Sequence, residues 1–188
     1  MWFCDEPGKV LSYVKTDANS GAQSTYEYVI KDKTVTDNRT TVIFDVVVPG
    51  QAVSSGCSVW AEDGWFYSDA SASIGQIGNG SYAKGNSPVL PDAPYVGQVL
   101  KDCSISIETL MLTSEYRKIR FTSNSDVTVP AGTFNCWCLD YDVVDTAMGL
   151  KARSRVKQWF AKGVGEVKSE TRDMNGRLIS QKELVEIK

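Results

Sequence analysis

The chain has 188 residues, of which 42% are hydrophobic and 23% are charged, which is typical of a globular protein. We therefore expect one folded domain over residues 1–188, without extended disorder. The chain contains no histidine and carries a net charge of −3. The lack of histidine excludes Ser-His-Asp or Cys-His catalysis and His-ligated metals. The weakly acidic charge argues against a nucleic-acid-binding or anionic-membrane-binding surface, which would show clustered basic residues.

The first third of the chain alternates apolar and polar residues with a period of two, which predicts strands. Val, Ile, Thr and Tyr are frequent there, and Gly, Asn and Asp separate the segments. The dipeptide Asp63-Gly64 predicts a tight hairpin turn. The expected strands cover residues 10–15, 24–35, 40–48, 59–61 and 66–68.

The middle of the chain, residues 69–94, has a different composition. It is rich in Ser, Gly, Ala and Asn, and it ends with Pro88, Pro91 and Pro94. Since it is too long for an ordinary connection, we expect a loop insertion that acts as a flap. Asp69 is a suitable N-cap for a short helix over residues 69–77.

The remaining sequence returns to the strand pattern. Pro130-Ala131-Gly132 and Asn175-Gly176 predict turns between strands. The expected strands cover residues 104–109, 115–122, 125–129, 133–144, 153–161, 165–172 and 177–186. The whole pattern predicts a mainly β fold of about ten strands. These form one large curved antiparallel sheet, as a half-barrel, a partly open barrel or a sandwich.

Two charged patterns admit both a structural and a functional interpretation. Asp140 and Asp142 share one strand face at a spacing that approaches that of the two carboxylates of a glycosidase, but a solvated face is the interpretation that we favour. Four basic residues alternate in the next strand, where a solvated face is again favoured over an anion-binding stripe. They are Lys151, Arg153, Arg155 and Lys157.

Aromatic side chains are the best candidates for ligand contact. Core packing explains most aromatic residues in strands. A curved sheet with an aromatic concave face and a flap would also hold an apolar ligand, provided that it encloses a cavity of a few hundred Å³. The candidate ligand-binding residues are Trp65, Tyr67, Trp137, Tyr141 and Trp159.

The five cysteines fit no zinc-binding spacing, and we expect neither a metal site nor a cofactor. Cys136 and Cys138 are separated by one residue. On a strand this spacing places them too far apart for an easy mutual disulfide. Each would have to reach another strand, with Cys4 and Cys103 as candidate partners. With Cys57 the count is odd, and buried, reduced thiols are the alternative.

Two segments carry a family resemblance: residues 128–136 (TVPAGTFNC) and 159–170 (WFAKGVGEVKSE). They resemble motifs of a TapB-like family of secreted or periplasmic Bacteroidetes proteins, which is similar to the LolA/LolB type of lipoprotein-carrier fold. The resemblance implies an antiparallel half-barrel and an export signal that has been removed. It also implies an oxidising compartment, with at least one disulfide among Cys4, Cys103, Cys136 and Cys138.

These observations together predict a non-enzymatic protein of the cell envelope. No apolar run approaches the roughly 20 residues of a transmembrane helix. The family resemblance implies a periplasmic, outer-membrane-associated or secreted protein. The expected function is binding of a hydrophobic or amphipathic ligand, such as a lipid, on the curved sheet. The alternatives are a structural module that contacts another envelope protein and, third, a hydrolase that uses Asp or Glu.

Overall fold

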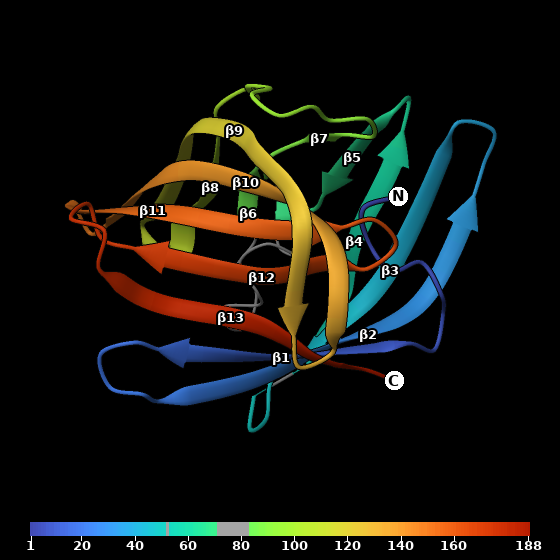
Figure 1. Cartoon of the computed structure of the whole chain (residues 1–188), viewed down its shortest axis with the longest axis horizontal. Helices are drawn as coiled ribbons and strands as arrows, with labels where there is room; N and C mark the ends of the chain where they lie inside the picture. Colours follow the sequence, from blue (N-terminus) through green and yellow to red (C-terminus); the bar gives the residue numbers. More distant parts are fainter. Residues whose placement is uncertain (52, 71–82) are drawn as a thin grey trace.

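The computed structural model describes residues 1–51, 53–70 and 83–188. These residues form one antiparallel sheet of 13 strands and one 3₁₀ helix, η1 (Figure 1). The elements are β1 Val10–Asp17, β2 Gln23–Val35, β3 Arg39–Val47, β4 Ser54–Glu62, β5 Trp65–Ser68, β6 Ala83–Gly85, β7 Leu90–Pro91, β8 Cys103–Ile107, η1 Glu108–Leu110, β9 Leu112–Val129, β10 Gly132–Ala147, β11 Leu150–Ala161, β12 Gly165–Arg172 and β13 Leu178–Ile187. The predicted fold class, a large curved antiparallel sheet, is confirmed.

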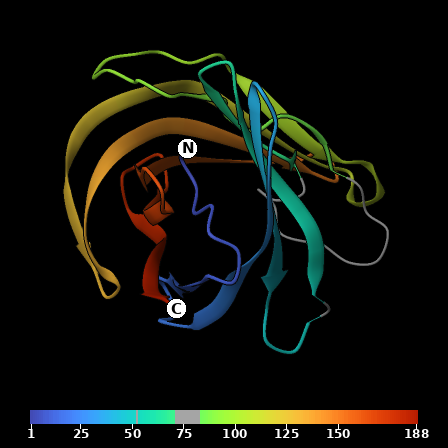
Figure 2. The ribbon, with the colours of Figure 1, turned by 90° about the vertical axis from the view of Figure 1, so that its right-hand side faces the viewer.

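The strand order brings the two edges of the sheet close together in sequence. Neighbouring strands follow the order β6-β8-β9-β10-β11-β12-β13-β1-β2-β3-β4-β5-β7. The two edge strands, β6 and β7, are therefore separated by residues 86–89 alone. Figure 2 shows the sheet curling around the N-terminal segment. The result is an open barrel whose two edges are connected by one short stretch of chain.

Bulges in β9 help to curve this sheet. Two register shifts interrupt its pairing with β10, and Lys118 lies at one of them with a φ of +57°. An extra residue on one strand bends that strand and increases its twist. The predicted break between residues 115–122 and 125–129 is wrong, because β9 is continuous over 18 residues. Asn124, in the expected gap, pairs with Trp137 of β10.

The predicted hairpins are present, and one has a longer loop than expected. Asp63 and Gly64 have φ values of +49° and +79°, as a two-residue turn of type I′ requires. The hairpin at Asn175-Gly176 is wider, since the backbone N–H of Asp173 donates to Arg177 O at 2.9 Å. Its additional residues form a five-residue loop between β12 and β13.

The insertion at residues 69–94 is only partly described. The predicted helix at 69–77 lies almost entirely outside the described residues. The expectation of a continuous loop is wrong for the second half of the insertion, which contains the edge strands β6 and β7. β6 pairs with β8, and β7 pairs with β5. The insertion therefore supplies both edges of the sheet.

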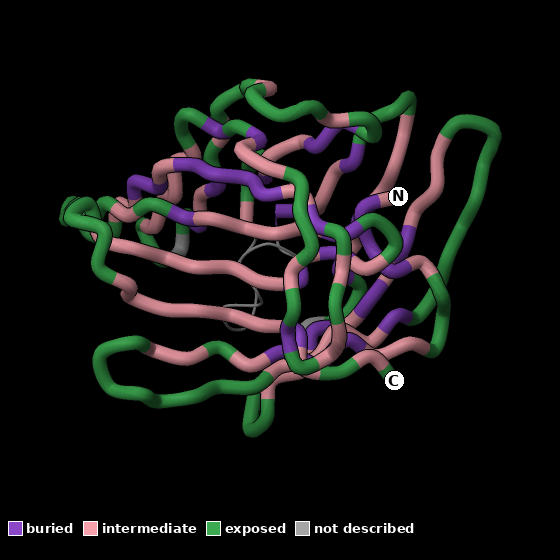
Figure 3. The backbone as a smooth tube through the Cα atoms, in the orientation of Figure 1, coloured by how far each residue is buried: buried purple, intermediate pink, exposed green. Residues whose placement is uncertain are grey.

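The N-terminal plug, which we define as residues 2–4, packs against the concave face as part of the core. Trp2, Phe3 and Cys4 are 1%, 6% and 5% exposed, and Figure 3 shows the buried backbone next to the N-terminus. The ring centroid of Phe3 lies 4.9 Å from that of Phe44. Gly165, with a φ of +111°, leaves room for this ring, because a Cβ there would lie 3.1 Å from Phe3 Cδ2.

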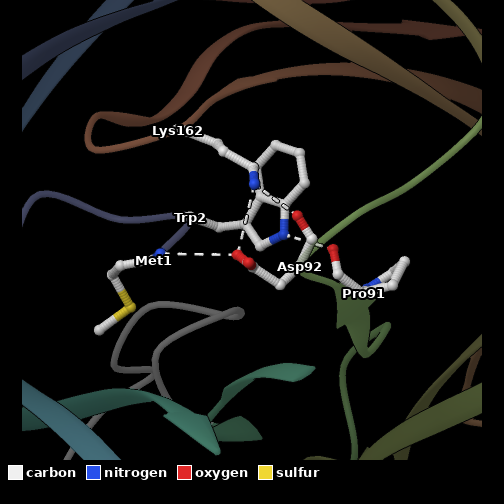
Figure 4. Close-up of polar contacts among 5 residues, drawn as sticks. All are labelled: Met1, Trp2, Pro91, Asp92 and Lys162. Carbon is white, nitrogen blue, oxygen red and sulfur yellow. Dashed lines mark hydrogen bonds and ion pairs between the residues drawn. The ribbon is translucent and has the colours of Figure 1, made fainter. Parts of the chain in front are cut away.

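Polar contacts hold the plug against β7 and the β11–β12 turn (Figure 4). The indole Nε1–H of Trp2 donates to Pro91 O at 2.8 Å. Lys162 Nζ lies 5.5 Å from the centre of the Trp2 ring and donates to the backbone carbonyl of Asp92. The plug thus contacts both the edge strand β7 and the β11–β12 turn.

Candidate ligand-binding site

The five aromatic residues proposed from the sequence lie on two different faces of the sheet. Tyr141 is on the concave face, and so is Trp137, whose ring meets Phe121 edge-on at 5.9 Å. Trp159 pairs with Cys138 on the opposite face. Tyr67 stacks on Trp60 at 5.3 Å, and Trp65 is 41% exposed at its hairpin. Tyr141 alone among the five lines the internal cavity.

The internal cavity lies between the N-terminal plug and the concave face of the sheet. Its volume is about 190 Å³. Part of its wall is aromatic or aliphatic and includes the rings of the plug. These apolar lining residues include Trp2, Phe3, Phe44, Phe66, Leu90 and Phe160. The volume does not reach the few hundred Å³ expected for an apolar ligand, nor the roughly 300–1,000 Å³ that is usual for drug-sized ligands. The plug occupies part of the concave space, so only a smaller ligand fits while the plug stays in place.

The other side of the cavity is polar and is built by four neighbouring strands, β10 to β13. Lys182 Nζ lies 2.6 Å from Glu166 Oε2. Gln158 Nε2 donates to the same oxygen at 3.1 Å, and Tyr141 OH donates to Gln158 Oε1 at 2.6 Å. We call these four residues the polar wall. Their side chains form one connected network on the concave face.

Glu166 reaches the concave face because of a register shift in β12. The shift lies between Trp159 and Phe160 of β11 and sets Phe160 opposite Glu166. Since Phe160 also lines the cavity, the Glu166 carboxylate is directed to the same side. Its second oxygen, Oε1, is buried and has no hydrogen-bond partner among the described residues. The polar wall therefore contains one unused acceptor.

Two aromatic rings lie beside the ammonium group of Lys182. Its Nζ lies 5.6 Å from the centre of the Tyr13 ring and 5.8 Å from that of Tyr26, and these two rings stack at 5.2 Å. Burial acts to lower the pKa of Lys182, but the Glu166 carboxylate raises it well above its ordinary value. Burial also raises the pKa of Tyr141. At neutral pH the polar wall therefore holds an ammonium group, on Lys182, and a protonated phenol, on Tyr141.

Sequence reasoning missed Glu166, Lys182 and Gln158. Strands β12 and β13 carry polar side chains on both faces, so alternation alone does not show which charges point inward. Lys168 and Glu170 form an ion pair at 3.3 Å on the opposite face of β12. The relevant signal would be a charged residue an even number of positions from an apolar core residue of the same strand, since the two would share a face. In β12 the bulge breaks this alternation, so the sequence does not show that Glu166 points inward.

The acidic pair suggested by the sequence lies away from this cavity. Asp140 and Asp142 share the face of β10 opposite to Tyr141, and they pair with Lys157 and Arg155 of β11. Asp140 is 9% exposed, so the expectation that this pair marks a solvated face is wrong for Asp140. On the same face, Asp142 forms ion pairs with Lys118 at 3.0 Å and with Arg155 at 3.3 Å.

The expected disulfides are not formed, and all five cysteines are free thiols. Cys103 pairs with Tyr116, whose ring meets Tyr141 on the concave face. In β10, Cys136 and Cys138 lie on the face opposite to that of Tyr141. The sheet therefore separates them from Cys103. Burial raises the pKa of Cys57, Cys103 and Cys136 to about 11. These thiols therefore stay protonated and pack as small apolar side chains.

Fold and cavity together define a class of protein, an open antiparallel β-barrel that wraps its own N-terminal plug. Two crystal structures share this fold. One is a "putative exported protein with YmcC-like fold" from Bacteroides fragilis NCTC 9343, with a TM-score of 0.84 and 18% identity over 99% of this chain and 98% of that one. The other is a "putative lipoprotein" from Parabacteroides distasonis ATCC 8503, with a TM-score of 0.84 and 19% identity over 100% and 98%.

The chain belongs to the DUF3108-like family, whose model matches residues 6–184. The comparison with curated proteins gave no match. Within the described residues, no helix is both long and apolar enough to cross a membrane. The similarity to exported proteins of Bacteroidetes agrees with the broad outline of the sequence prediction. The specific TapB-like and LolA-like assignments stay predictions.

Proposed function

We propose that this chain is a non-enzymatic protein of the cell envelope that holds a small amphipathic ligand in its internal cavity. An envelope location is supported by the names of the two structural neighbours, an exported protein and a lipoprotein. A binding role, as opposed to catalysis, is supported by the cavity lining. Its tyrosine phenols are protonated, and its described residues include no cysteine. These groups offer no activated nucleophile.

The unused oxygen of Glu166 is the observation that carries the proposal. A buried acceptor without a donor costs about 1–3 kcal/mol, and Glu166 Oε1 has no donor among the described residues. A ligand hydroxyl or ammonium group would remove this cost by donating to it. The facing aromatic wall would meanwhile bury the hydrocarbon part of the ligand. The expected ligand therefore has a donor at one end and an apolar body.

The cavity sets the size of this ligand. Its volume of about 190 Å³ corresponds to roughly six water molecules, which accommodates a short alkyl chain with a small head group. A longer chain would require the N-terminal plug to move. Because Trp2 and Phe3 line the cavity directly, displacement of the plug would enlarge the space along the concave face.

A series of six-carbon probes tests the proposal: 1-hexanol, hexylamine and hexanoate. We expect the alcohol and the amine to bind more tightly than the carboxylate, because Glu166 Oε1 accepts a hydrogen bond from the first two and repels the third. The indole N–H of Trp2 gives a separate NMR signal at the cavity wall, so its shift reports occupancy.

Two double variants provide the comparison. Glu166→Gln with Lys182→Met changes the polar wall, whereas Lys168→Met with Glu170→Gln changes an ion pair of similar burial on the opposite face. Only the first is expected to remove the preference for the alcohol over the carboxylate. Equal binding of all three probes to the unmodified protein, or no change at Trp2 with any of them, would contradict the proposal.

A further inference from the structure

Two neighbouring turns present an exposed apolar surface at one end of the barrel. The first follows η1, and the second connects β10 to β11. They are in direct contact, since the backbone N–H of Met148 donates to Met111 O at 3.3 Å. We define the apolar tip as Leu110, Met111, Met148 and Leu150, which are 38%, 64%, 75% and 78% exposed. In Figure 1 the β10–β11 turn lies at the left end of the molecule, away from both labelled termini.

The backbone at the tip does not favour the residues that occupy it. Met111 and Met148 have φ values of +46° and +49°, in the left-handed region that suits Gly, Asn and Asp. Met148 and Gly149 (φ +81°) form a turn of the type in which Asn-Gly is preferred. The local backbone conformation therefore does not explain why methionine occupies position 148. Its exposed side chain also contributes little to core packing.

Basic side chains begin beside the tip and continue along β11. Lys151 follows Leu150 directly, and Arg153 lies on the same strand face. Both are exposed, and neither forms an ion pair with another described residue. The acidic residue of the first turn, Glu108, is paired with Lys84 at 2.7 Å. The surface next to the tip thus presents unpaired positive charge.

We propose that the apolar tip docks on an anionic lipid surface, independently of any ligand in the cavity. Its side chains enter the boundary between head groups and acyl chains, while Lys151 and Arg153 contact the anionic head groups. A protein partner is a poorer fit, because a stable interface buries about 800 Å² on each side and the tip consists of four side chains on two turns.

Vesicle flotation with the full chain tests this proposal. The vesicles contain phosphatidylcholine with or without phosphatidylglycerol, at low and at high salt. We expect binding to the anionic vesicles at low salt, weaker binding to pure phosphatidylcholine, and a decrease with added salt. Failure of the unmodified protein to bind the anionic vesicles at low salt would overturn the proposal.

The tip variant is Met148→Asn with Leu150→Thr. Because asparagine suits the left-handed turn position, this variant should fold at least as well as the parent while its vesicle affinity falls about tenfold or more. The matched control is Val35→Thr with Val96→Thr, which changes residues that are 64% and 57% exposed, one at the β2–β3 hairpin and one in the segment before β8. The control should bind like the parent.

A charge variant separates the two parts of the contact. Lys151→Gln with Arg153→Gln should weaken binding at low salt and flatten its salt dependence. Two outcomes would refute the membrane assignment. One is equal vesicle binding by the tip variant and the parent. The other is self-association of the parent, lost in the tip variant, without any vesicle binding, which would assign the tip to contact with a second copy.

Discussion

Replacing Trp2 by alanine should destabilise the fold as strongly as the loss of a central core residue, although Trp2 lies next to the chain end. Its side chain is 1% exposed, and its ring stacks on Phe121 at 6.4 Å. Truncation of a buried Phe or Trp to Ala costs about 3–5 kcal/mol. The hydrogen bond to Pro91 accounts for about 1 kcal/mol of this, and the Lys162 contact for about 0.5–1 kcal/mol.

Urea unfolding with three variants measures these contributions. Trp2→Phe keeps most of the packing and should lose about 1–2 kcal/mol. Trp2→Ala should lose about 3–5 kcal/mol, which for a chain of this length lowers the Tm by roughly 6–20 °C. Trp65→Ala removes a tryptophan that is 41% exposed and should cost less than about 1 kcal/mol. A loss below about 1 kcal/mol for Trp2→Ala would show that the plug does not stabilise the barrel.

Three further predictions concern the polar wall, the thiols and the sheet edge. Glu166→Gln should lower the free energy of unfolding in urea by up to about 3 kcal/mol, because it leaves the Lys182 ammonium buried without its carboxylate. Adding Lys182→Met should recover part of this loss. Additive losses from the two substitutions would refute the coupling. The pKa of Cys57 rises from 9.0 to about 11 on folding. The stability that buried thiols contribute should therefore be fully present below pH 9 and should be lost as the pH rises towards 11. An unfolding free energy that is constant between pH 9 and 11 would contradict this. Gly85→Ala should detach β6 from β8, because a Cβ would lie 2.0 Å from Ser104 O; hydrogen exchange at β8 should become faster, and unchanged protection would refute it.

The sequence was sufficient to predict most strands because their signals are local. Alternation marks β1, β2 and β3 to within two residues at each end, and Asp63-Gly64 marks the β4–β5 hairpin. The edge strands β6 and β7 have three and two residues, too few for any periodic signal. The continuity of β9 depends on a bulge, and a polar stretch that spans a bulge is indistinguishable from a turn in the sequence.

The site was harder to predict, because parity separates the two faces of a strand but does not say which one is concave. Trp159 and Phe160 are adjacent aromatic residues, and only Phe160 lines the cavity. Along β4 and β5, Trp60 and Tyr67 stack on one face while Phe66 lines the cavity on the other. Only tertiary structure reveals the choice, since the curvature and the plug decide which face becomes the interior.

Native mass spectrometry of the full chain, purified from the envelope of cells that produce it, tests the central claim most directly. The account predicts a fraction of molecules carrying an additional small mass, which is released on activation and is absent from the Glu166→Gln, Lys182→Met double variant. The Lys168→Met, Glu170→Gln variant should retain it. Protein that shows only its own mass, or an additional mass that the double variant retains in full, would contradict the assignment of the cavity as a ligand-binding site.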